Sequence, residues 1–89
     1  HDLAKFLNNL ASVYNEKGDF HKAGEYYEKS YEIYKNVYAE NLNHTDIALC
    51  LNNLASVYNQ KGYFKKGQEY YEKSYEIYKN VYGDNHNHN

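Results

Sequence analysis

The chain has 89 residues, a formal net charge of −2 and a hydrophobic fraction of 42%, in which tyrosine is the most abundant residue. This length limits the chain to one compact domain with a modest core. The nearly neutral charge gives no general electrostatic attraction to nucleic acid or to an anionic membrane. No apolar run approaches the roughly 18 residues that a membrane span needs.

The first predicted helix covers the segment from Leu3 to Tyr14. Its apolar residues recur every three or four positions, which is the periodicity of an amphipathic helix. Lys17-Gly18 then predicts the end of this helix, and Lys61-Gly62 predicts the end of a later one, because glycine readily adopts the positive φ of a helix C-terminus.

The second predicted helix begins near Phe20 and ends near Tyr38, and it is rich in tyrosine. At 100° per residue its apolar and aromatic side chains fall on one broad arc, and its charged side chains fall on the other. On the charged arc, Glu25–Lys29 is spaced to form an i,i+4 ion pair. The apolar arc is too wide for one neighbour, so we expect the helix to pack between two others.

A short polar connection follows at Asn41–His44, and Thr45 is the predicted N-cap of a third helix, with Asp46 in its first turn. From here the sequence repeats. LNNLASVYNEK at Leu7–Lys17 returns as LNNLASVYNQK at Leu51–Lys61, and EYYEKSYEIYKNVY at Glu25–Tyr38 returns unchanged at Glu69–Tyr82. The shift from Leu7 to Leu51 is 44 residues, a spacing typical of helical repeat proteins.

The duplication predicts an all-α fold of four antiparallel helices, with repeat 1 at residues 1–44 and repeat 2 at residues 45–89, in a single domain over 1–89. Residues 84–89 are predicted to be a disordered tail. The lack of any methionine, with His1 at the start, favours a fragment of a longer array, and the lone Cys50 gives no sign of an oxidising compartment, so we expect a cytoplasmic protein.

Eight positions in each copy follow one order of residue types: large, small, aromatic, turn, aromatic, small, aromatic and small. The first copy has Leu10, Ala11, Tyr14, Gly18, Phe20, Ala23, Tyr27 and Ser30, and the second has Leu54, Ala55, Tyr58, Gly62, Phe64, Gly67, Tyr71 and Ser74. This pattern resembles the tetratricopeptide repeat family, and its long second helix resembles the kinesin light chain variety. The connection at Ala39–His44 departs from that variety because it is longer and lacks proline. The resemblance implies an α-solenoid with right-handed superhelical stacking.

The resemblance also implies a function, which is binding of an extended peptide or a partner helix along a groove lined by the first helix of each repeat. The groove residues that it implies are Lys5, Asn8, Asn9, Ser12 and Asn15, with Leu49, Asn52, Asn53, Ser56 and Asn59 in the second copy. Side-chain amides can both donate to and accept from a peptide backbone. In the competing interpretation these amides are only solvated or bond to the neighbouring turn. A clamp for a terminal carboxylate is not expected, since Lys5 has Leu49 as its counterpart.

No grouping of residues predicts catalysis, a metal site or a cofactor, so we do not expect an enzyme. Cys50 is interpreted as a small buried thiol, and His21 and His44 as isolated exposed residues. His86 and His88 could bind a metal only weakly.

Two repeats are fewer than the roughly three that usually give independent stability. We therefore expect the open ends of the array to associate between molecules, either head-to-tail or about a two-fold axis, as a second possible role beside peptide binding. The face predicted for this homo-oligomer consists of Leu3, Phe6, Tyr70, Ile77, Tyr78 and Val81. A stable monomer with a frayed last helix is the alternative.

Overall fold

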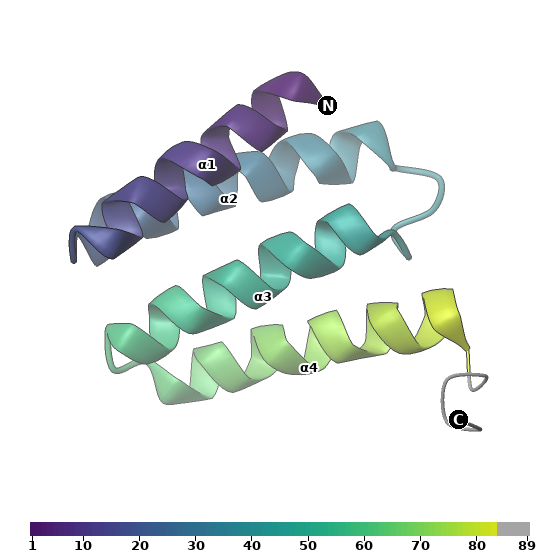
Figure 1. Cartoon of the computed structure of the whole chain (residues 1–89). Helices are drawn as coiled ribbons and strands as arrows, with labels where there is room; N and C mark the ends of the chain where they lie inside the picture. Colours follow the sequence, from purple (N-terminus) through teal and green to yellow (C-terminus); the bar gives the residue numbers. More distant parts are fainter. Residues whose placement is uncertain (84–89) are drawn as a thin grey trace.

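The computed structural model describes residues 1–83, which form four helices: α1 (Asp2–Glu16), α2 (Phe20–Val37), α3 (Thr45–Gln60) and α4 (Phe64–Tyr82). The predicted disordered tail, with His86 and His88, lies outside these residues. Each helix packs antiparallel against the next one in sequence, so that the chain forms two stacked helix pairs (Figure 1). The all-α fold predicted from the duplication is confirmed.

The turns inside the two helix pairs are built in the same way. Gly18 and Gly62 have φ values of 84° and 88°, which lie in the left-handed region that favours glycine. Each glycine ends its helix by donating a backbone hydrogen bond to Asn15 or Asn59, respectively. The sequence therefore correctly predicted both helix ends.

The α2–α3 connection is held by a cluster of three side chains. The Tyr38 and His44 rings stack with their centroids 3.7 Å apart, and the Tyr38 hydroxyl donates to Asp46 Oδ2 at 2.9 Å. His44 Nδ1 accepts from the Asp46 backbone N–H at 3.1 Å, which makes His44 the N-cap of α3. Two predictions were therefore wrong: Thr45 is inside the helix, and His44 is neither isolated nor fully exposed. The imidazole replaces the hydroxyl as the capping acceptor because it is held in place by Tyr38.

The core follows the line between the two helix pairs. It consists of two clusters of buried side chains, one around Tyr34, Ile47, Cys50 and Leu51, and one around Tyr27, Leu54 and Val57. Tyrosine rings pack around both clusters, as expected for an aromatic residue with a polar tip. Cys50 is fully buried, as predicted, and burial raises the pKa of its thiol, which therefore stays protonated at neutral pH.

Each pair of helices is clamped internally by a serine. Ser30 Oγ in α2 donates to the Ala4 carbonyl in α1, and Ser74 Oγ in α4 donates to the Ala48 carbonyl in α3, both at 2.9 Å. Both serines are buried, and their small side chains allow the paired helices to approach closely. The hydroxyl satisfies its own hydrogen-bonding need at that contact.

Most lysines of the second helices lie over tyrosine rings. Lys29 Nζ is 5.5 Å from the Tyr26 ring centroid, and Lys73 Nζ is 5.8 Å from that of Tyr70. The predicted Glu25–Lys29 ion pair is not formed among the described residues, because the ring three positions earlier attracts the ammonium group instead. At an exposed site the two interactions have similar strength, about 0.5 kcal/mol.

Candidate functional site

The residues expected to line a groove divide into two groups in the structure. Six of them lie at matching positions along α1 and α3 and are exposed or half-buried; we name this strip the first-helix face. Its members are Lys5, Asn9 and Ser12 on α1 and Leu49, Asn53 and Ser56 on α3. The side-chain amides of Asn9 and Asn53 have no hydrogen-bond partner among residues 1–83, so they can bind a ligand.

The other four predicted residues have different environments. Asn8 lies between α1 and α3, where its Nδ2 is 3.7 Å from Cys50 Sγ. Asn52, its counterpart, is exposed on the side of α3 where no further helix is described. Asn15 Oδ1 is buried without a hydrogen-bond partner, and the Asn59 side chain packs over Gly67 of α4. These four side chains belong to the contacts between helices and to the edge of repeat 2.

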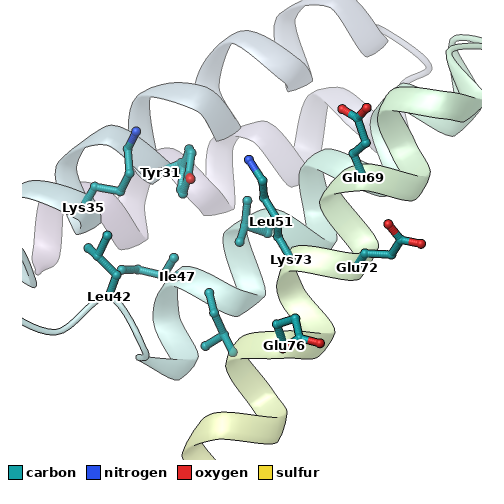
Figure 2. Close-up of a pocket in the computed structure, with 10 residues that line it drawn as sticks. Tyr31, Lys35, Leu42, Ile47, Leu51, Glu69, Glu72, Lys73 and Glu76 are labelled. Atoms are coloured by element: carbon teal, nitrogen blue, oxygen red, sulfur yellow. The ribbon is translucent and has the colours of Figure 1, made fainter.

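A cleft of about 430 Å³ lies between α2, α3 and α4, and sequence reasoning missed it. Figure 2 shows its apolar floor, with Ile47 and Leu51 of α3, and its charged walls, with Lys35 on α2 and Glu69 and Glu76 on α4. The apolar arc of the second helices was the available signal. The arc predicted that these helices touch two neighbours, but not that space would remain between them.

The charges around this cleft are partly used within the chain. Lys35 Nζ is 3.1 Å from Glu32 and lies over the Tyr31 ring, and its pKa is raised by the hydrogen bond to Glu32.

A hydrogen bond also joins α3 to α2 outside this cleft, where the Tyr58 hydroxyl donates to Glu28 Oε2 at 3.0 Å. Burial, with the Glu28 carboxylate, raises the pKa of Tyr58 to about 12, so this tyrosine is a neutral donor at physiological pH.

The predicted self-association residues also separate into groups. Leu3 and Phe6 are exposed on α1, and Tyr78 is half-buried on α4. Tyr70 and Ile77 instead pack against the core clusters. Val81 is exposed, but so is its counterpart Val37, although α2 is covered by repeat 2. The exposure of Val81 is therefore a property of its side of the helix and not of an open end.

Along its whole length, α4 carries an exposed aromatic surface that the prediction did not include. Phe64, Tyr71, Tyr75 and Tyr82 are exposed there, whereas their counterparts Phe20, Tyr27, Tyr31 and Tyr38 are half-buried or buried. On α1, Val13 is likewise exposed whereas its counterpart Val57 is buried, and the prediction did not include it. The 44-residue shift was the signal that could have found them, since residues that α2 uses against α3 recur on α4.

Two further classes of site were sought among the described residues, namely metal sites and membrane-spanning helices. Within residues 1–83 no three histidine, cysteine or acidic side chains are grouped so that they could hold a metal ion. None of the four described helices is long and apolar enough to cross a membrane.

Stacked antiparallel helix pairs that repeat in sequence and share one core define an α-helical repeat protein. Two family models, each described as a tetratricopeptide repeat, match residues 2–62 and 47–88. The chain therefore belongs to the tetratricopeptide repeat family, whose members are generally protein–protein interaction modules and typically non-catalytic. A search of curated proteins and a search of solved structures each found no match.

Proposed function

We propose that this chain binds an extended peptide or a partner helix along the first-helix face. The observation that supports the proposal is the pair of unpartnered amides, Asn9 and Asn53, at equivalent positions of adjacent helices. A peptide backbone presents donors and acceptors in regular alternation, which two such amides can satisfy together. Lys5 and Leu49 at the same level add a charged and an apolar contact, so the ligand carries an acidic and an aliphatic residue.

The test is selection of peptides from a random library on the wild-type chain, followed by calorimetric titration of the best binder. The double variant Asn9→Ala/Asn53→Ala is expected to weaken binding at least tenfold, because each lost amide leaves peptide groups unpaired. The control Lys35→Ala/Glu76→Ala alters the cleft of Figure 2 and is expected to bind normally. Loss of binding only in the control would move the ligand to that cleft, and failure to select any binder would refute the proposal.

The 44-residue spacing and the long second helices also support assignment of the repeats to the kinesin light chain variety, which we include in the proposal. We also propose that this chain is located in the cytoplasm and that its partners are proteins.

A second function, association between copies of the chain, is favoured by a specific observation. Side chains at equivalent positions are covered in one repeat and open in the other: Val13 is 47% exposed whereas Val57 is fully buried, and Tyr71 is 39% exposed whereas Tyr27 is 5% exposed. The two open surfaces are the two halves of the interface that α2 and α3 already form. Equilibrium sedimentation over a dilution series is expected to show species larger than the monomer, and monomer at every concentration would refute this function.

A further inference from the structure

The contact between α2 and α3 is a template for a contact between two molecules. It joins the Tyr-rich helix of one repeat to the first helix of the next, and both helices recur almost unchanged at the open ends, as α4 and α1. Figure 1 shows α1 and α4 as the two outermost helices, each with one side that no described helix covers. A second copy could therefore place its α1 on α4 as α3 is placed on α2.

The polar pairs of the template are retained at the ends. Glu28 and Tyr58, which are hydrogen-bonded within the chain, correspond to Glu72 and Tyr14. Tyr38 and Asp46, which are also hydrogen-bonded, correspond to Tyr82 and Asp2. A second copy in the template register would thus find a carboxylate for each of two tyrosine hydroxyls.

Four buried positions of the template differ at the open ends: Ile47, Cys50, Ala23 and Gly24 correspond to Leu3, Phe6, Gly67 and Gln68. Leucine is close in size to isoleucine and Gly67 is smaller than Ala23, so only two of the four positions become larger. The first is Cys50, a fully buried thiol 3.6 Å from the Ser30 hydroxyl, whose counterpart is Phe6, 60% exposed. The site holds a small side chain between Ser30 and Tyr34, so a phenyl ring would overfill it.

The second position is Gly24, where a Cβ atom would lie 3.6 Å from Val57 Cγ1. That distance is an ordinary contact, so alanine fits, but the remaining atoms of a longer side chain have no room directly above Val57. The counterpart of Gly24 is Gln68, whose Nε2 donates to Glu72 Oε2 at 3.2 Å. Gln68 therefore occupies space on α4, and its amide is bonded to the carboxylate that Tyr14 of a second copy would also approach, which keeps further acceptor sites.

We propose that a second copy of the chain docks its α1 on α4 in the register of the α2–α3 contact, and that Phe6 and Gln68 limit the strength of this docking. This inference rests on the self-association proposed above and identifies its geometry and the residues that oppose it. Because the contact joins unlike faces, a dimer leaves one face of each kind open, to which further copies can add.

The test restores the template at both positions with Phe6→Cys/Gln68→Ala, studied under reducing conditions. Alanine is used at position 68 because it fits the template and preserves the helix. Equilibrium sedimentation is expected to give at least tenfold tighter association than the wild type, with circular dichroism confirming that both are folded. A tighter variant supports the inference even if the wild type stays monomeric, which would refute only wild-type self-association. Equal association of both would refute the register, and monomer in both would refute both ideas.

A mixing experiment tests whether the faces pair head-to-tail. In the Phe6→Cys/Gln68→Ala background, Val13→Asp blocks the α1 face and Tyr75→Asp blocks the α4 face; both side chains are exposed, so folding is not at risk. Each blocked variant alone is expected to be monomeric, and their mixture to form a one-to-one dimer and nothing larger. Association of either blocked variant alone, or no dimer in the mixture, would overturn the head-to-tail contact.

Discussion

The two repeats show how one sequence is used in two environments. The identical run has three buried residues at Glu25–Tyr38 in α2 but only one at Glu69–Tyr82 in α4, and the first helices bury two residues in α1 and seven in α3. The difference arises because α2 and α3 each have helices on two sides, whereas α1 and α4 each pack closely against one described helix. Burial in this chain is therefore set by neighbours and not by residue type, and most of the core lies at the junction of the repeats.

The largest expected effect comes from the same substitution in both copies. Leu54→Ala removes a fully buried side chain at the junction and is expected to cost about 3 kcal/mol of unfolding free energy. Leu10→Ala, its counterpart, removes a half-buried side chain and is expected to cost about 1 kcal/mol. Urea denaturation followed by circular dichroism measures both, and a Leu54 variant that no longer folds agrees with the expectation. Equal losses at the two positions would contradict the difference between the repeats.

A second prediction concerns Gly24, which lies at the junction of the repeats and corresponds to Gln68 on the open side of α4. Gly24→Gln gives repeat 1 the residue that repeat 2 carries at position 68, and it is expected to lower stability by about 1–2 kcal/mol, since overpacking outweighs the better helix propensity. Gly24→Ala is the matched control, and its Cβ makes an ordinary contact with Val57, so it is expected to raise stability by about 0.5–1 kcal/mol. Thermal unfolding compares the two variants. Stabilisation by glutamine would show that the junction has unused space, and would also weaken the case that Gln68 limits docking.

The helices, the helix ends at Gly18 and Gly62, the buried Cys50 and the repeat class could all be predicted, because each depends on local periodicity or on the repeated pattern. What could not be predicted depends on the pairing of surfaces. Hydrophobicity placed Tyr70 and Ile77 at an open end because they lie on the same arc as Tyr78, but a broad arc faces two neighbours and the sequence does not show which side remains open. The capping role of His44 was missed since it requires the Tyr38 ring, which the loop brings back onto the helix start.

A third prediction uses the hydrogen bond that crosses the junction. Tyr58→Phe removes the donor to Glu28 and is expected to cost about 1 kcal/mol, whereas Tyr14→Phe, at a position where no described helix supplies a carboxylate, is expected to have no measurable cost. The raised pKa adds a pH signature, because the unfolded tyrosine loses its proton near pH 10 and the folded one near pH 12. The contribution is therefore complete below pH 10 and is lost as the pH rises toward 12. Urea denaturation between pH 8 and pH 11.5 is expected to show a steeper loss of stability in the wild type than in Tyr58→Phe, and parallel losses would contradict the assignment.

The last prediction concerns a contact that does not depend on neighbours. Ser30→Ala and Ser74→Ala each remove a hydroxyl that bonds to the first helix of its own repeat, and each is expected to cost about 1 kcal/mol. Ser30 is also 3.6 Å from Cys50 Sγ, but a thiol is a weak partner, so we expect the two losses to agree within about 0.5 kcal/mol. Agreement in urea denaturation would show that each repeat contains a neighbour-independent clamp, on which the unequal junction contacts are added. A loss confined to Ser30 would mean that the contribution of this contact differs between the two repeats, and would contradict a neighbour-independent clamp.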